Sequence, residues 1–304
     1  MRVRFKGLDL NLLIALDALL LERNVSAAAR KVFLSQSAMS GALARLREHF
    51  QDELLVPLGR RMVLTAAAEG LSGPLHQLML QIEATVGAGM RFDPATSRRS
   101  FVVHASDYMT EVVLNRVVVA LAADAPHVVV EIVPPLDDPA ATLETGEVDL
   151  LITPEPYISR EHPAHLLYEE QYVVVGWQGN EELARPLTAD AFFELGHVVV
   201  RFAQSRSTAF AEDEIAKLNR SRRVEMIAPS FTSVPKMLVG TRRVSVMHRR
   251  LAAIYARSLP LVVLPMPFEI RPLREMIQHH QVRTADAGVQ WMRERIAREA
   301  QSVD

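Results

Sequence analysis

Residues 24 to 47 read NVSAAARKVFLSQSAMSGALARLR, and this stretch decides the fold of the N-terminal part of the chain. The pattern predicts two short helices joined by a tight turn. In the second helix, Met39, Leu43 and Leu46 follow the i, i+4, i+7 spacing of one buried stripe. Another face carries small residues, namely Ser37, Ser40, Gly41 and Ala44. Because a helix in a DNA major groove needs short side chains at closest approach, the pattern indicates a helix-turn-helix.

Flanking residues supply the caps and the packing that such a helix pair needs. A hydroxyl at a helix start accepts from free backbone N–H groups, so Ser26 is expected to cap the first short helix and Ser35 the second. Leu34 is expected to fill the turn as an apolar plug. A preceding helix is predicted from the period of Leu10, Leu13, Leu16 and Leu20. The alternative is a helical subdomain without a nucleic-acid role; the caps, the small face and the basic segment that follows favour DNA binding.

The basic segment covers residues 53–65 and reads ELLVPLGRRMVLT. Two apolar runs flank Gly59, Arg60 and Arg61, which predicts a hairpin with a cationic tip. Such a wing can place arginine beside phosphates or in the minor groove. A bare Gly-Arg-Arg is more often a solvated turn, but its position directly after the helix pair favours the wing.

The distribution of charge fits a protein that touches DNA with one end only. The formal net charge is −2, yet residues 1–65 hold ten Lys and Arg against six Asp and Glu. The remaining residues hold 24 against 30. A basic N-terminal part followed by an acidic remainder supports the helix-turn-helix interpretation, which still rests on the sequence motif itself.

Composition excludes several other classes of protein. A chain of 304 residues can form two or three domains, and no apolar stretch reaches the length of a membrane span. The absence of Cys excludes disulfides, cysteine nucleophiles and thiolate metal sites. Since the N-terminus lacks the pattern of a secretion signal, we expect the bacterial cytoplasm, at the nucleoid.

A long helix is predicted after the wing, over residues 66–90, with Thr65 as its cap. A short a/d seam runs along it, formed by Leu71, Leu75, Leu78 and Ile82. The helix therefore either pairs with a second copy or packs as a core helix of a neighbouring domain. Residues 91–100 contain Pro94, which disfavours continued helix, and are expected to form a hinge.

Apolar strands alternate with helices from Phe101 onward. Strands are predicted over 101–105, 128–133, 148–153, 198–202, 223–227 and 244–247. Helices are predicted over 107–124, near 137–146, and over 208–219, 232–239 and 289–300. Such a pattern indicates parallel sheets covered on both faces. Crossing strands near 168–176 and 261–265 join the two α/β lobes into a clamshell, and the cleft between them is the expected ligand site.

No catalytic constellation stands out in the sequence. It contains no Gly-x-Ser-x-Gly elbow, no phosphate-binding glycine loop and no His-Glu-x-x-His motif. The histidines at 162, 165, 279 and 280 do not follow the spacing of a known metal site. We therefore expect neither an enzyme nor a metal or other cofactor.

The most informative cleft segment runs from Ser106 to Thr110, where a strand ends and a helix begins. Backbone N–H groups and short hydroxyls there can hold a polar ligand group, which selects Ser106, Asp107, Tyr108 and Thr110 as candidates. Asp107 alternatively caps the helix, and its carboxylate opposes a bound anion. We therefore expect a neutral or phenolic ligand rather than a dicarboxylate.

Residues 8–65 and the later segments resemble the LysR-type transcriptional regulators. The stretches 92–95 (FDPA), 106–109 (SDYM) and 146–150 (GEVDL) are most similar to the branch of nodulation and aromatic-degradation regulators. The resemblance implies an N-terminal winged helix-turn-helix, a long linker helix for dimerisation, and a C-terminal α/β effector domain similar to periplasmic binding proteins. It also implies dimers or tetramers on promoter DNA, with RNA polymerase as a further partner.

The resemblance also suggests individual contacts. It maps base contacts to Gln36, Ser37 and Ser40, whereas Gly41 and Pro57 replace arginines that are common in the family. The full set of expected DNA-binding residues is Ser26, Ser35, Gln36, Ser37, Ser40, Gly41, Arg45, Arg60 and Arg61. The effector-binding candidates beyond 106–110 are Pro135, Leu136, Phe202, Ala203, Phe231, Thr232 and His248.

The expected organisation has four parts. They are the DNA-binding domain 1–65, the linker helix 66–90, the hinge 91–100 and the effector domain 101–304, with lobe I over 101–167 and 267–304 and lobe II over 168–266. The expected function is transcriptional regulation in response to a small aromatic or phenolic effector. The alternative is a cytoplasmic small-molecule-binding protein whose helical head only dimerises it.

Overall fold

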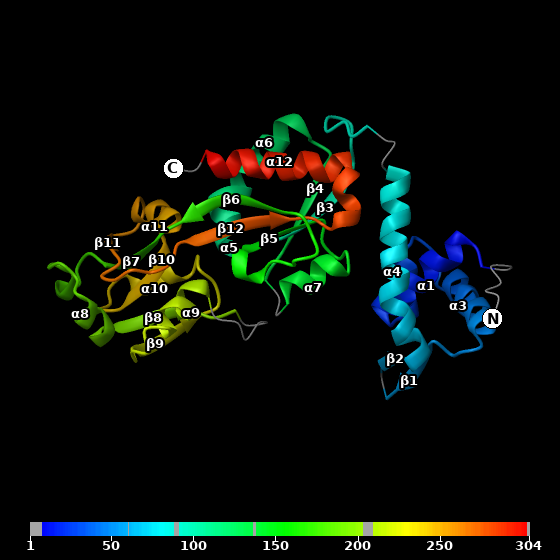
Figure 1. Cartoon of the computed structure of the whole chain (residues 1–304), viewed down its shortest axis with the longest axis horizontal. Helices are drawn as coiled ribbons and strands as arrows, with labels where there is room; N and C mark the ends of the chain where they lie inside the picture. The colour runs from blue at the N-terminus through cyan, green and yellow to red at the C-terminus, as the bar shows by residue number, and fades with distance from the viewer. Residues whose placement is uncertain (1–7, 60, 88–90, 136–137, 203–208, 303–304) are drawn as a thin grey trace. The chain divides into compact units, whose positions relative to one another are not determined.

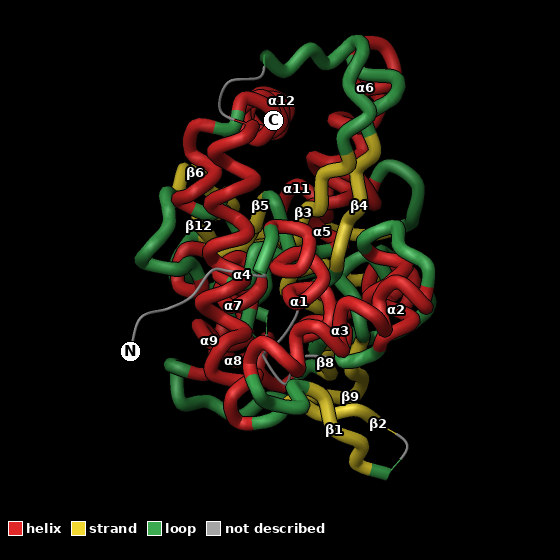
Figure 2. The backbone as a smooth tube through the Cα atoms, turned by 90° about the vertical axis from the view of Figure 1, so that its right-hand side faces the viewer, coloured by secondary structure: helices red, strands yellow, loops and turns green. Residues whose placement is uncertain are grey.

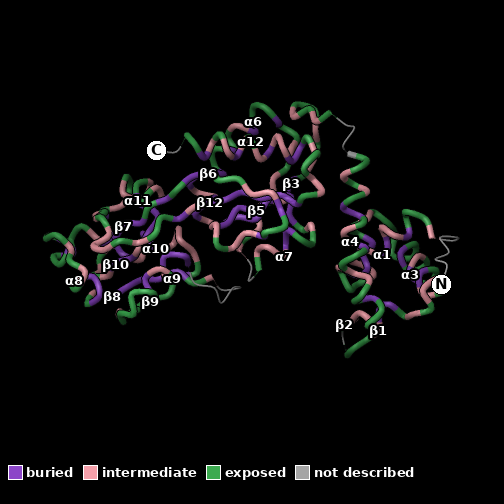
Figure 3. The backbone as a smooth tube through the Cα atoms, viewed as in Figure 1, coloured by how far each residue is buried: buried purple, intermediate pink, exposed green. Residues whose placement is uncertain are grey.

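A computed structural model describes residues 8–59, 61–87, 91–135, 138–202 and 209–302 (Figure 1). The chain divides into two compact units, Met1–Met90 and Arg91–Asp304. Figure 3 shows buried residues in both units, in the inner strands β5 (Leu150–Pro154) and β8 (Gly196–Val200) of the two sheets and along α1 (Leu10–Glu22). Each unit therefore has an interior of its own.

The first unit is a winged helix-turn-helix followed by a long helix, as the sequence predicts. Its elements are α1 (Leu10–Glu22), α2 (Val25–Lys31), α3 (Gln36–Phe50), β1 (Leu55–Leu58), β2 (Arg61–Leu64) and α4 (Ala66–Gly87). The predicted stripe of Met39, Leu43 and Leu46 is fully used in the core. The two strands pair as an antiparallel hairpin.

The helix caps agree with the prediction at two positions and differ at a third. The Ser35 hydroxyl accepts from the backbone N–H of Ala38, and Thr65 caps α4 in the same way. Ser26, in contrast, caps nothing, because α2 begins earlier and the Asn24 side chain accepts from the Ala27 N–H. Ser26 is thus a half-buried residue within the first turn of α2.

The turn between α2 and α3 is not plugged by Leu34. That side chain is 42% exposed, and Val32 packs against the core in its place. Phe33 is 96% exposed and has a φ of 56°, a left-handed conformation that a side chain with a Cβ adopts at a cost. The turn is therefore closed by backbone geometry and by Val32.

The predicted seam of α4 is used largely within the same unit. Leu75 and Met79 are buried in the helix-turn-helix core, with Leu71 and Ile82 partly buried against it. The His76 ring and the Asp17 carboxylate on α1 lie 2.9 Å apart. Of the four predicted seam residues only Leu78 is exposed. A heptad pattern does not show which helix packs against its apolar seam. Here that helix is α1 of the same unit.

The first sheet of the second unit defines lobe I, with strand order β4-β3-β5-β12-β6. Its strands are β3 (Ser100–His104), β4 (Val129–Val133), β5 (Leu150–Pro154), β6 (Ala164–Glu170) and β12 (Leu273–Gln278). Its helices are α5 (Asp107–Met109), a π-helical turn (Thr110–Leu114), α6 (Asn115–Asp124), α7 (Pro139–Glu144) and α12 (Ala287–Gln301). Residues 91–99 belong to this unit, where Arg99 pairs with Asp286 at 2.6 Å.

The second sheet defines lobe II, with strand order β11-β7-β10-β8-β9. Its strands are β7 (Tyr172–Trp177), β8 (Gly196–Val200), β9 (Arg223–Ala228), β10 (Val244–His248) and β11 (Leu261–Pro265). Its helices are α8 (Ala189–Glu194), α9 (Phe210–Ala216), α10 (Val234–Leu238) and α11 (Arg249–Ala256).

Both sheets are mixed, whereas the sequence predicted parallel ones. The chain crosses between the lobes from β6 to β7 and again from β11 to β12. The strands next to these crossings run antiparallel to their neighbours: β7 to β10 and β11, and β12 to β5 and β6. The parallel pairs are those joined by helical crossovers, as expected for such connections.

Replacing Phe33 by glycine should raise the free energy of unfolding by about 0.5–1 kcal/mol, because glycine adopts a positive φ without a Cβ clash. Urea denaturation of the full chain, followed by circular dichroism, measures this. Leu34→Gly is the control, since it removes a side chain at a position without a positive φ and should destabilise. A loss of stability in Phe33→Gly would show that the ring packs against the protein.

Candidate functional site

The exposed face of α3 has the surface that contact with DNA requires. Gln36, Ser37, Ser40, Gly41 and Ala44 are all exposed, opposite the buried stripe of the same helix. A methyl group added at Gly41 would meet no atom within 4 Å. The shallow face predicted from the sequence is therefore open on this helix.

The start of α3 is held by its own serines. The Ser35 hydroxyl lies 3.1 Å from the Ala38 N–H that it accepts and 3.0 Å from the Ser37 hydroxyl. The hydroxyl of Ser35 is thus used in the cap, whereas Gln36 and Ser40 have exposed side chains. Arg45 is also exposed and lies 3.9 Å from the Asp9 carboxylate, which leaves its guanidinium accessible.

The wing is positioned by two polar clamps. Arg47 on α3 donates to the backbone carbonyls of Glu53 and Leu55, each at 2.8 Å. Asp52 accepts from the Leu54 N–H at 2.7 Å and from the Thr65 hydroxyl at 2.6 Å, so it joins both ends of the hairpin. These hydrogen bonds lower the pKa of Asp52 and keep it ionised.

The tip of the wing carries exposed cationic and apolar side chains. Arg61 pairs with Leu58 across the hairpin, and both are exposed. Gly59 has a φ of 64°, which the tight turn requires. The predicted contact Arg60 lies outside the described residues, so Arg61 is the described cation of this tip.

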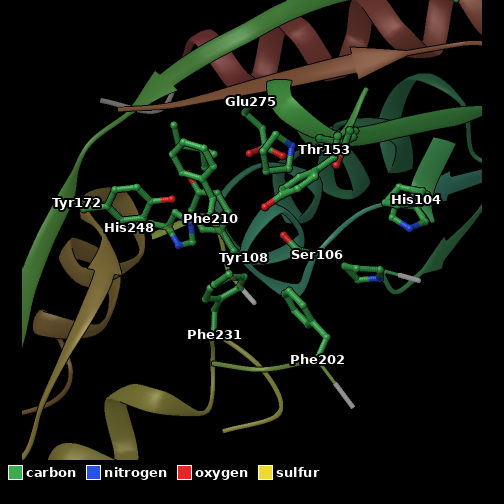
Figure 4. Close-up of a pocket in the computed structure, with 17 residues that line it drawn as sticks. His104, Ser106, Tyr108, Thr153, Tyr172, Phe202, Phe210, Phe231, His248 and Glu275 are labelled. Atoms are coloured by element: carbon green, nitrogen blue, oxygen red, sulfur yellow. The ribbon is translucent and has the colours of Figure 1, made fainter. Parts of the chain in front are cut away.

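A cavity of about 160 Å³ lies between lobe I and lobe II (Figure 4). Six of the predicted effector residues line it, namely Ser106, Tyr108, Pro135, Phe202, Phe231 and His248. Several other lining residues were not predicted from the sequence, among them His104, Thr153, Tyr157, Tyr172, Phe210 and Glu275. The predicted residues Leu136 and Ala203 lie outside the described residues.

Eight of the 17 residues that line the cavity carry an aromatic ring. The rings of Tyr108 and His248 are stacked with centroids 3.8 Å apart. Phe231 meets His248 edge-on at 4.7 Å and Phe202 at 5.4 Å. Burial lowers the pKa of His248 to about 3, so its ring is neutral at physiological pH. The wall therefore suits a flat, uncharged ligand.

A buried hydrogen-bond chain lies behind Tyr108. Its hydroxyl donates to a carboxylate oxygen of Glu170 at 2.6 Å and accepts from the Tyr168 hydroxyl at 2.9 Å. Arg250 lies 3.4 Å from the same Glu170 oxygen and 4.3 Å from the centroid of the Tyr168 ring. Burial raises the pKa of Tyr108 and Tyr168 well above the usual value, so both remain protonated donors.

One interpretation of the sequence, that Asp107 caps the helix α5, is wrong. The cap is Ser106, whose hydroxyl accepts from the Met109 N–H at 3.2 Å. Asp107 instead accepts from the backbone N–H and the hydroxyl of Thr232 in lobe II, both at 2.7 Å. Asp107, Thr232 and Thr110 do not line the cavity. The Thr110 hydroxyl donates to the backbone carbonyl of Ser106.

A second hydrogen bond also crosses between the lobes. The hydroxyl of Tyr157, at the end of a 3₁₀ turn in lobe I (Glu155–Tyr157), donates to Asp213 on α9 at 2.9 Å. Burial is the main cause that raises the pKa of Tyr157, so the phenol stays protonated. We call the pairs Asp107–Thr232 and Tyr157–Asp213 the interlobe latch.

No group of three or more His, Cys, Asp or Glu side chains in the described part of the molecule has an arrangement that could hold a metal ion. None of the helices within the described ranges combines the length and apolar composition of a membrane span.

Known protein families match both units. The family described as "Bacterial regulatory helix-turn-helix protein, lysR family" matches residues 10–69, and "LysR substrate binding domain" matches residues 94–301. Nodulation protein D of Bradyrhizobium sp. (strain ANU 289) is 41% identical over 301 residues, which cover 99% of this chain and 89% of that protein. Nodulation protein D 2 of Rhizobium tropici is 41% identical over 298 residues, covering 98% and 95%.

Solved structures show the same fold. A probable transcriptional regulator from Pseudomonas aeruginosa has 27% identity and a TM-score of 0.70, covering 99% of this chain and 98% of that one. Full-length OxyR from Pseudomonas aeruginosa, at 15% identity, has a TM-score of 0.77 and covers 98% and 96%.

A winged helix-turn-helix followed by a two-lobed ligand-binding body defines a ligand-responsive, DNA-binding transcriptional regulator. The chain belongs to the lysR family of these regulators, and the predicted resemblance to nodulation regulators is confirmed.

Asp107→Ala should lower the free energy of unfolding by about 1–3 kcal/mol, because the N–H and hydroxyl of Thr232 lose a charged acceptor in a half-buried position. Urea denaturation of the full chain measures the change. Thr232→Val keeps the backbone N–H bond and should lose less. Unfolding of Asp107→Ala at the wild-type midpoint would contradict the latch.

Proposed function

We propose that this regulator binds promoter DNA through the exposed face of α3 and the wing, and that its effector is a small neutral aromatic or phenolic molecule. The observation that carries the effector class is the cavity wall, whose described lining residues are largely aromatic or apolar and include no Lys or Arg. A ligand carboxylate would therefore find no cation in that wall. An uncharged ring would meet only aromatic and neutral groups.

The size of the cavity supports a small effector. A volume of about 160 Å³ is close to that of a ~150 Å³ protein cavity that binds benzene. A single substituted ring therefore fits while the interlobe latch stays closed.

Self-association is supported by two apolar faces of the effector domain. Lobe I exposes Val118 and Val119 on α6 and Val129 on the edge strand β4, and lobe II exposes Met226 and Ile227 on the edge strand β9. Figure 2 shows α6, β4 and β9 along the same side of this unit. Two copies related by a twofold axis can cover both faces at once, since each lobe I then meets the lobe II of its partner.

Dimerisation joins two winged helix-turn-helix units, so that two small contact surfaces together give a high affinity for DNA. Dimers of helix-turn-helix domains read half-sites about 34 Å apart or at multiples of that spacing. Promoter binding places the protein at the nucleoid in the bacterial cytoplasm, where RNA polymerase is a further partner. The effector acts by favouring one arrangement of the heads over another.

Footprinting on the upstream region of its own gene tests the proposal as a whole. The full-length protein is expected to protect a specific site, and 4-hydroxyacetophenone is expected to change the protected pattern, whereas benzoate is not. A protein that binds the ring compound without any footprint would be a small-molecule-binding protein instead. A larger response to benzoate than to the neutral ring would overturn the effector class.

Ser40→Arg is expected to weaken binding to the natural site at least tenfold or to shift base preference, because a long cation replaces a small side chain at closest approach. Electrophoretic mobility shift with the natural site and a randomised pool measures both. Ser258→Arg adds the same side chain at an exposed position of the second unit and serves as the control. Unchanged affinity and preference in Ser40→Arg would remove α3 from the groove.

Arg61→Ala is expected to weaken binding to all DNA sequences alike and to reduce the slope of log K against log salt by about 1, as loss of one phosphate contact does. Salt titrations on specific and random duplexes give the slope. Arg185→Ala removes an exposed arginine of the second unit and should change neither value. A change confined to one base position would show that Arg61 reads sequence.

A further inference from the structure

One acidic side chain in the cavity wall has a role that the proposed function leaves unexplained. Glu275 on β12 lines the cavity and is only 3% exposed. Leu273 lines it from the same face of that strand. The pairing of β12 with β6 shifts register between Glu275 and Met276, and such a bulge re-aims side chains. Figure 4 shows Glu275 across the cavity from Phe202 and Phe231.

The carboxyl group of Glu275 has no hydrogen-bond or ion-pair partner among the residues that the structure describes. The neighbouring Glu170 is satisfied, since it accepts from Tyr108 and from the Gln171 N–H and pairs with Arg250. Buried polar groups are nearly always hydrogen-bonded in native proteins. Glu275 therefore has donor and acceptor capacity directed at whatever occupies the cavity.

The surroundings of Glu275 keep it uncharged. Burial, and next the negative charge of Glu170, raise the pKa of Glu275 to about 8. Arg250 pairs with Glu170, and Arg274, next to Glu275 in the sequence, pairs with Glu155 and Glu169. The other titratable groups near Glu275 are neutral at physiological pH, namely Tyr108, Tyr168, Tyr172 and His248. At neutral pH the group is thus a carboxylic acid with an O–H to donate.

We propose that Glu275 selects the effector by donating a hydrogen bond to an uncharged acceptor oxygen on the aromatic ring, such as an aryl carbonyl or a phenol oxygen. This inference rests on the proposed aromatic effector and names the group that recognises it. A ring without such an oxygen leaves the acid unpaired. A ring that carries a carboxylate brings a second negative charge close to Glu170, whose charge already raises the pKa of Glu275.

Calorimetric titration of the full-length protein tests the proposal with acetophenone, toluene and benzoate as probes. Acetophenone is expected to bind about three- to tenfold more tightly than toluene, the gain of one hydrogen bond, and benzoate more weakly than both. Glu275→Leu should remove the difference between acetophenone and toluene. Glu275→Gln should keep it, because an amide N–H also donates.

The dependence on pH separates hydrogen-bond donation from a purely structural role. As pH rises from 7 to 9 the acid loses its proton, so acetophenone affinity in the wild type should fall about two- to fivefold, toward that of toluene. Glu275→Gln cannot lose a proton there and should show a flat profile. Glu169→Gln removes an exposed carboxylate of β6 outside the cavity and should behave as the wild type.

Stability of the ligand-free protein gives an independent measurement. Glu275→Leu should raise the melting temperature by a few degrees, because a buried acid without a partner is replaced by an apolar group of similar size. Binding of acetophenone that is equal in the wild type, Glu275→Gln and Glu275→Leu would overturn the role of Glu275 and leave the aromatic effector standing. Absence of binding by both neutral rings to the wild type would overturn both.

Discussion

The hydrogen bonds from Thr232 to the Asp107 carboxylate are the constraint on which the effector site depends. The start of a helix favours a negative charge, and in many proteins a ligand supplies it. Here the protein itself supplies the negative charge. Asp107, the first residue of α5 in lobe I, accepts hydrogen bonds from Thr232 in lobe II. One interaction therefore joins the lobes and satisfies the two donors of Thr232 within the protein. What remains for the ligand is a neutral, aromatic space.

The path of the chain between the lobes explains which polar side chains reach the cavity. Lobe I is completed only when β12 returns from lobe II and inserts between β5 and β6. The returning strand carries Glu275 into the cavity, and β7, which leaves lobe I, carries Tyr172 there. Both residues lie next to the crossings, so the wall is built from segments far apart in sequence. A displacement of either lobe changes the distance between these two side chains.

Patterns with a local cause were predictable from the sequence, and those with a distant cause were not. The stripe of Met39, Leu43 and Leu46 follows from helical periodicity, and its burial is confirmed. The strand that carries Glu275 was missed, because charged residues within it disguise a strand that is buried only once the chain returns to lobe I. Ser26 was misplaced by two residues because Asn24 caps equally well. The apolar seam of α4 was predicted from the sequence, but the sequence did not show that α1 packs against this seam.

The energies involved limit how the cavity can control the DNA-binding heads. Each hydrogen bond to a charged group contributes about 1.5–3 kcal/mol, so the Asp107 bonds bias the lobes toward the closed arrangement by a factor of roughly ten or more. A ligand shifts that balance only by its difference in affinity between the two arrangements. A ligand that fits between the lobes with the interlobe latch intact strengthens the existing bias, and one that fits only with the lobes further apart opposes it. The latch therefore ties the direction of the response to the size of the ligand.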